Sequence, residues 1–278
     1  HIFQTLLKQA SEKLDAVREV AGNVIRKLVN KTNVQFTHIP ERDILTACSV
    51  PSLLEKYGAV TLASLDINWG HPGDVFPYVV QLMDSSTKYF DAIVSGIVIS
   101  VGGMTETVVR ESSRALTKWC ARMCSDDNKT ALLQLANCLQ ALFGAHSNDD
   151  RIIIPLLKCL ELLLREGAFG SMLDGDNVAM GFLTSAKNEM QGCGDVHKVI
   201  ACINVIIHLL GHPGAVRYMS MKSLLFLLGH KYPRIRKYTA EHLYMHVIAD
   251  PDMIGVERAS EDFSGRGAFE ENATELNI

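Results

Sequence analysis

Hydrophobic residues recur at helical spacing along most of the chain. From Phe3 to about Lys31, apolar side chains stand three or four positions apart with charged residues between them, which predicts one long amphipathic helix. Helical periodicity resumes at Pro77 and continues to Ala249. The helices predicted there span 78–83, 88–101, 105–124, 130–146, 151–165, 178–190, 196–210, 216–228 and 234–249. Segment 94–101 holds five β-branched residues and therefore also resembles a strand.

A short internal repeat indicates how these helices are organised. The tetrapeptide Leu-Leu-Gly-His occurs at 209–212 and again at 227–230, and each copy is followed by a proline and an apolar-arginine pair. A spacing of this length accommodates one helix and one turn, so the repeating unit is a pair of helices. Residues 232–243 fit the pattern of a HEAT repeat, with Ile235, Thr239 and Leu243 on one helix face. The predicted fold is an all-α solenoid of stacked helix pairs, of HEAT/armadillo type.

Two segments depart from the helical pattern. Residues 33–73 are rich in proline and glycine and predict an irregular insert, with short helices around Ile44 and Leu54. Residues 251–278 hold seven acidic residues against two arginines, and few large apolar ones. We therefore expect a helical-repeat domain over 1–250, followed by an acidic, flexible tail over 251–278.

Charge and cysteine usage narrow the classes of function. The net charge is −4, and the excess of acids at 251–278 leaves the helical part nearly neutral, which argues against nucleic-acid binding. The seven cysteines are an odd number scattered through apolar segments, as in a reduced cytosolic protein. No apolar run reaches the roughly 20 residues that span a bilayer, and no signal peptide is visible. The expected location is the cytoplasm.

Several residue pairs have spacings that could carry chemistry. His208 with His212, and His242 with His246, stand four positions apart, but neither pair has the HExxH pattern. Cys120 and Cys124 lack the Cys-x2-Cys spacing and are interpreted as buried thiols, whereas Cys193 lies between glycines and is expected to be exposed. Gly102-Gly103 is interpreted as a helix end before a helix that starts at Thr105. We therefore predict no catalytic, cofactor-binding or metal-binding residues and no enzyme activity.

One continuous segment is more specific than the helical periodicity. Residues 95–113, Ser-Gly-Ile-Val-Ile-Ser-Val-Gly-Gly-Met-Thr-Glu-Thr-Val-Val-Arg-Glu-Ser-Ser, resemble a signature of the C-terminal region of the tubulin-folding cofactor D family. Asn68-Trp69, Phe76-Pro77, the segment 154–158 and the segment 232–237 match the same family in the same order. The family usually continues past the last repeat with another apolar helix, whereas Asp250-Pro251 here opens the acidic tail.

The resemblance implies a function in the folding of tubulin. Members of the family are helical-repeat chaperones that capture β-tubulin and assemble or dismantle the αβ-tubulin heterodimer. They work with the C and E types of tubulin cofactor and with an Arf-like small GTPase. Any activation of GTP hydrolysis is expected only within such a complex, in association with the cytoskeleton. The alternative is a general adaptor solenoid that binds peptides or a small GTPase.

A cluster of basic residues provides the candidate partner-binding side chains. It contains Arg217, Lys222, Lys231, Arg234, Arg236 and Lys237. Arg217 and Arg236 stand where HEAT repeats use an internal arginine to bridge neighbouring helices. Because tubulin is acidic, the other four residues, Arg234, Lys237, Lys231 and Lys222, are the predicted contacts with the partner. The alternative is that Arg234, Lys237 and Glu241 form an ordinary solvated helix face.

Overall fold

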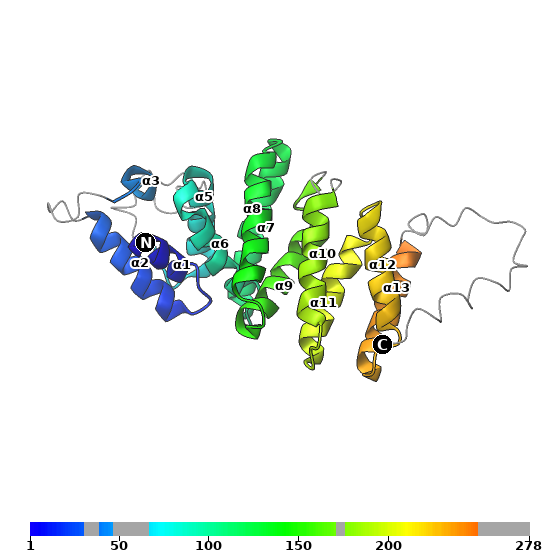
Figure 1. The fold of residues 1–278 in the computed structure, drawn as a ribbon. Coiled ribbons are helices and arrows are strands. Elements are labelled where there is room, and N and C mark those ends of the chain that lie inside the picture. Colours follow the sequence, from blue (N-terminus) through cyan, green and yellow to red (C-terminus); the bar gives the residue numbers. More distant parts are fainter. Residues whose placement is uncertain (31–38, 47–66, 171–175, 250–278) are drawn as a thin grey trace, which may run out of the picture.

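The computed structural model describes residues 1–30, 39–46, 67–170 and 176–249. Within these ranges the regular structure is entirely helical, and the helices stack into an elongated solenoid (Figure 1). The predicted all-α solenoid of stacked helix pairs is confirmed. The short helix α3 (Arg42–Thr46) forms around Ile44 as expected. The second short helix, near Leu54, and the acidic tail over 251–278 both lie outside the described residues.

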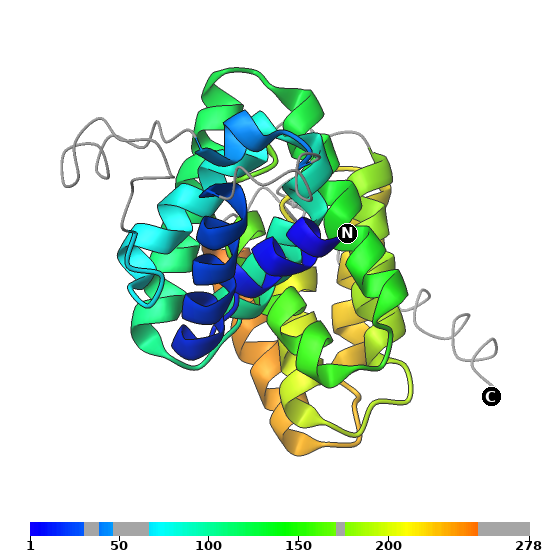
Figure 2. The same cartoon turned by 90° about the vertical axis from the view of Figure 1, so that its left-hand side faces the viewer.

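The contacts between helices define two layers, and Figure 2 looks along them from the end that contains α1. One layer consists of α5 (Pro72–Ser85), α7 (Glu106–Ser125), α8 (Lys129–Ala145), α10 (Asp176–Met190) and α12 (Ala215–Leu227). The other consists of α1 (Ile2–Ala10), α6 (Thr87–Val101), α9 (Asp150–Arg165), α11 (Val196–Leu209) and α13 (Pro233–Ala249). The core is the continuous apolar seam between the layers, because each helix packs on its neighbours in its own layer and on a partner in the other.

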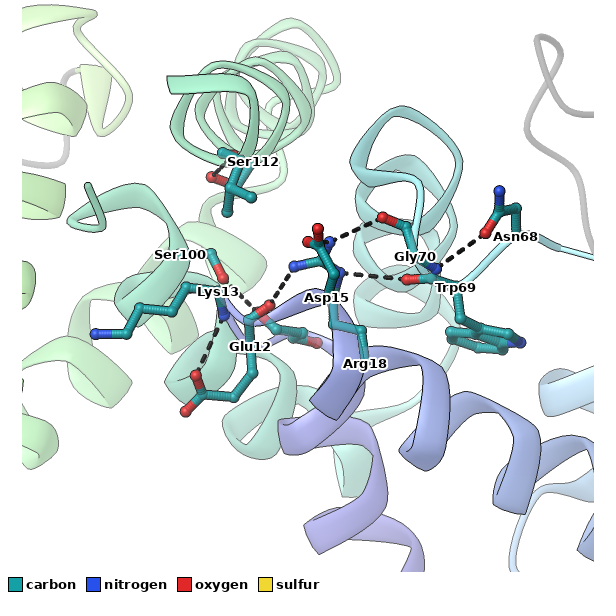
Figure 3. A network of polar contacts seen from close by, with 11 residues as sticks. Glu12, Lys13, Asp15, Arg18, Asn68, Trp69, Gly70, Ser100 and Ser112 are labelled. Carbon is teal, nitrogen blue, oxygen red and sulfur yellow. Dashed lines mark hydrogen bonds and ion pairs between the residues drawn. The ribbon is translucent and has the colours of Figure 1, made fainter. Parts of the chain in front are cut away.

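The chain bends where one long N-terminal helix was predicted, and that prediction is wrong. α1 ends at Ala10, and α2 (Asp15–Asn30) turns back onto it. The hydroxyl of Ser100 donates to the carbonyl of Ser11 at 2.7 Å, and the guanidinium of Arg18 donates to the carbonyl of Glu12 at 2.8 Å (Figure 3). Side-chain donors thus satisfy carbonyls that a continuous helix would have bonded itself.

The Arg18 side chain is fully buried and joins this bend to the segment before α5. It also donates to the carbonyl of Trp69 at 3.3 Å and to that of Gly70 at 3.2 Å, and it forms an ion pair with Asp15 (Figure 3). A buried guanidinium is tolerated only when its donors are satisfied. The polar network of Arg18 therefore fixes the N-terminal hairpin, formed by α1 and α2, against the segment before α5.

α6 is the most completely buried part of the seam. Its segment 94–101, which also resembled a strand, is helical and lies between α1, α5, α7 and α9. A Cβ atom at Gly96 would lie 2.4 Å from the carbonyl oxygen of Lys8 in α1, and one at Gly102 would lie 2.2 Å from Cα of Pro155 in α9. Gly102 ends α6 as predicted, but its φ of −83° requires no glycine, so close packing is the reason for this residue.

α13, the last helix in the described part of the chain, contacts α11 in part through polar side chains. Only Ile235 and Thr239 of α13 are buried. The hydroxyl of Tyr238 donates to Oδ1 of Asn204 at 2.7 Å, and the Asn204 amide donates to Glu161 at 3.1 Å. The rings of His208 and His246 meet edge to face, with their centroids 6.3 Å apart. Burial, followed by the charges of His246 and Arg165, lowers the pKa of His208.

We predict that Gly96→Val strongly destabilises the protein. The valine would place atoms where the backbone of Lys8 lies, and such overpacking typically costs about 1–3 kcal/mol or more of the free energy of unfolding. Gly144→Ala in α8 is the control, because open space surrounds this position and alanine gains about 0.5–1 kcal/mol in a helix. Urea denaturation of both variants provides the measurement. Equal stability of the two variants would contradict the close α1–α6 contact.

A second prediction concerns the pH dependence of folding. The fold favours neutral His208, whereas an unfolded histidine has a pKa of about 6.5, so the unfolded chain binds more protons in mildly acidic solution. The free energy of unfolding should therefore be highest above about pH 7 and fall as the pH drops through about 6.5. Thermal denaturation at about pH 7.5 and 5.5 should show a smaller loss for His208→Gln than for the unmodified protein. Exposed His197→Gln is the control and should retain the full loss.

Candidate functional site

A groove of about 810 Å³ lies between α10 and α12, with α11 at its base. We call it the basic groove. The residues that line it are Lys187, Asn188, Met190, Gln191, Gly192, Cys193, Val199, Met219, Lys222, Ser223, Phe226, Leu227, His230 and Lys231. Most of them come from α10, from α12 and from the turns that follow these two helices, and Val199 comes from α11. The groove therefore exists only once the two repeats have stacked.

Local sequence shapes the two turns at the end of the groove. α10 ends at Met190, where Gly192 adopts a φ of +71°, a conformation that favours glycine. The carboxylate of Asp195 then caps α11 by accepting a hydrogen bond from the amide of His197 at 2.8 Å. α12 ends at Leu227, and the amide of His230 bonds to the Leu227 carbonyl at 3.1 Å. The two copies of Leu-Leu-Gly-His thus mark equivalent helix ends, those of α11 and α12.

Arg217, which is half-buried, and Arg236, which is exposed, each connect neighbouring helices as expected. The Arg217 guanidinium donates to the carbonyls of Leu210 at 3.0 Å and Gly211 at 3.3 Å. Arg236 donates to the carbonyls of His230 at 2.8 Å and Lys231 at 3.2 Å. Each arginine in the first turn of a helix therefore satisfies carbonyls at the end of the preceding one. Arg236 also holds in place the turn that carries one rim of the groove.

The charged side chains that line the basic groove are all positive. Lys187, Lys222 and Lys231 line it, and none of its lining residues is acidic. In the part of the chain that the structure describes, no carboxylate forms an ion pair with any of these lysines. Lys231 lies over the ring of Tyr232, with its nitrogen 5.1 Å from the ring centre. Partial burial, then the charges of Lys231 and Arg236, lower the pKa of His230 and keep it neutral near pH 7.

The structure divides the four predicted partner-binding residues between two places. Lys222 and Lys231 line the basic groove. Arg234 and Lys237 lie on the exposed face of α13 outside it, and Lys237 forms an i,i+4 ion pair with Glu241 at 3.6 Å. Lys187 and the apolar walls of the groove were not predicted. The signal that could have found Lys187 is the packing of α10 beside α12 in one layer, which depends on the order of the helices.

The burial of two of the three cysteines discussed above, Cys124 and Cys193, differs from the prediction. Cys120 is buried as predicted, and desolvation raises its pKa. Cys124 is exposed rather than buried, because α7 turns it away from the seam, although its thiol still reaches the carbonyl of Ala168 at 3.3 Å. Cys193 is half-buried rather than exposed, because the turn after α10 folds it into the basic groove. None of the described residues forms a group of three potential metal ligands, the paired histidines included.

None of the helices in the described part of the chain is both long and apolar enough to cross a bilayer.

Comparison with known proteins identifies the family. The model of the family described as Tubulin folding cofactor D C terminal matches residues 1–198. Tubulin-specific chaperone D of Dictyostelium discoideum is 21% identical over 251 residues, which cover 86% of this chain and 16% of that protein. The chain thus spans about a sixth of the length of this relative. No solved structure matches the chain. Because the family model covers well over half of its residues, from α1 into the first turn of α11, the chain belongs to the tubulin folding cofactor D C-terminal family.

Proposed function

We propose that this chain is the C-terminal module of a tubulin-folding chaperone and that it binds β-tubulin. The observation that carries the proposal is the family match over 1–198, together with a relative named as a tubulin-specific chaperone. The surface of the module supports it: the basic groove is open, has apolar walls and carries three lysines without an acidic residue. Tubulin is acidic, so the field of such a surface would favour encounter and orientation.

The proposal extends to the assembly in which the module works. We propose that it takes part in the assembly and disassembly of the αβ-tubulin heterodimer, together with the C and E types of cofactor and an Arf-like small GTPase. Its proposed location is the cytoplasm, in association with the cytoskeleton. Arg234 and Lys237, on the exposed face of α13, remain proposed contacts beside Lys222 and Lys231 in the groove.

We further propose that the module is not an enzyme and that any GTP turnover occurs on tubulin within a multi-cofactor complex. The sequence contains no Gly-x4-Gly-Lys-Ser/Thr loop to hold phosphates. Gly102-Gly103, the one glycine pair before a helix, is occupied by the contact with Pro155. These observations favour a binding surface over a catalytic site.

The second candidate is an adaptor solenoid that binds peptides or a small GTPase without any function in tubulin folding. The shape of the basic groove favours it to the same degree, because a groove between stacked helices suits many peptides. The two candidates differ in the partner that they retain.

We predict that the immobilised chain retains β-tubulin from a purified mixture of αβ-tubulin and an Arf-like GTPase. Retention should weaken as salt is raised, because charged side chains contribute to the encounter. Serum albumin, another acidic protein, is the control for non-specific charge attraction and should pass through. Retention of the GTPase without tubulin would instead favour the adaptor, and passage of both proteins would contradict each candidate.

We also predict that the purified chain alone does not hydrolyse GTP. Phosphoryl transfer needs a phosphate-binding loop and a held divalent ion, and the sequence has no such loop. Release of phosphate from GTP, followed over a range of GTP concentrations, provides the measurement. Saturable hydrolysis by the chain alone would overturn the non-enzymatic assignment.

A further inference from the structure

We propose that the basic groove binds an extended acidic segment of a partner protein that inserts one large apolar side chain between α10 and α12. The inference goes beyond the proposed function, because it concerns the chemistry of the bound segment whichever protein carries it. It rests on the charge, the apolar walls and the size of the groove.

The positive charge of the groove favours an anionic ligand. Lys187 comes from α10, Lys222 from α12 and Lys231 from the turn after α12, so the three lysines belong to both sides of the concavity rather than to one helix. Lys187 is half-buried, and none of the three has an acidic partner among the described residues. Like charges around a partly apolar groove repel one another, and carboxylates of a bound segment would relieve that repulsion.

The apolar walls of the groove favour a ligand that also carries an apolar side chain. Met190 and Met219 are partly buried, and Val199 and Leu227 form the buried base. Phe226 stands at the rim with 72% of its surface exposed, although most large apolar residues of this layer are buried. Methionines adapt to the shape of a guest, and an exposed aromatic ring beside them is typical of a binding surface.

The size of the groove distinguishes a peptide from a small anion. About 810 Å³ lies within the range of sites that enclose a drug-sized molecule, so it accommodates one large side chain with its flanking main chain. A phosphate or a chloride ion would satisfy the lysines but leave Met190, Met219 and Phe226 uncovered. A nucleic acid would need a more extended basic surface than three lysines on a nearly neutral body.

The test uses the full chain and a fluorescein-labelled peptide in which a central phenylalanine is flanked on each side by four glutamates. Fluorescence anisotropy should show saturable binding that weakens with added salt. The triple variant Lys187→Glu, Lys222→Glu, Lys231→Glu should bind at least about tenfold more weakly. The matched control is Lys27→Glu, Lys118→Glu, Lys158→Glu, which changes the net charge equally at three exposed lysines outside the groove and should bind as the unmodified chain does.

A second peptide tests the apolar wall. Replacing its phenylalanine by alanine should weaken binding by at least about tenfold, or about 1.4 kcal/mol, if the side chain enters the groove, because the buried ring would be lost. Circular dichroism of both triple variants establishes that they remain folded. Equal binding by the two variants would overturn the assignment of the site, and equal binding of the two peptides would overturn the apolar component.

One further outcome concerns the chain itself. Residues 251–278 are acidic and contain Phe263 and Phe269, so they have the chemistry proposed for the partner. Zero-length cross-linking of the full chain, read by mass spectrometry, detects any bond from the groove lysines to these acids. Such a bond, with no peptide binding, would overturn the partner as the occupant. Because the peptide contains no tubulin, failure of peptide binding while tubulin is retained would overturn this inference and leave the proposed function standing.

Discussion

The close approach of α6 to α1 on one side and to α9 on the other is the constraint on which the solenoid depends. It is possible because Gly96 and Gly102 have no side chain at the two contacts. Through α1 the approach positions the N-terminal hairpin, with Ser100 bonded to Ser11. Through α9 it aligns the layer that continues into α11 and α13, over which the basic groove is built. A small change in the distance from α6 to α1 or to α9 would therefore displace the helices on both sides of α6 in the stack.

The same constraint explains why the most specific part of the sequence does not contain the candidate site. Segment 95–113 covers the second half of α6 and the first part of α7, and its small residues serve packing: Gly96, Ser100 and Gly102 each face another helix. A side chain at Gly96 or Gly102 would collide with the backbone of α1 or α9, so this crossing requires residues without one. The groove, by contrast, straddles the end of the family match, since α10 lies within 1–198 and α12 beyond it.

Sequence alone predicted the helices well, because each buries one apolar stripe with helical spacing, but it did not predict which distant segments meet. The predicted N-terminal helix was wrong because Arg18 and Ser100 bond carbonyls at the bend, and Ser100 lies far away in the sequence. Lys222 and Lys231 could be proposed because they belong to the cluster of basic residues between 217 and 237. Lys187 and Met190 could not, since they join the groove only through the packing of α10 on α12.

The three arginines that bond backbone carbonyls, Arg18, Arg217 and Arg236, have a consequence for how the two ends of the solenoid fold. Arg217 and Arg236 bind carbonyls only five to seven residues earlier in the chain, so these links close small loops and can form as soon as each helix pair is made. Arg18 instead reaches carbonyls 51 and 52 residues later. Closing that loop is slower, and until it closes the guanidinium stays in water. The C-terminal repeats are thus suited to early, local folding, whereas the N-terminal hairpin should be among the last parts to acquire its native contacts.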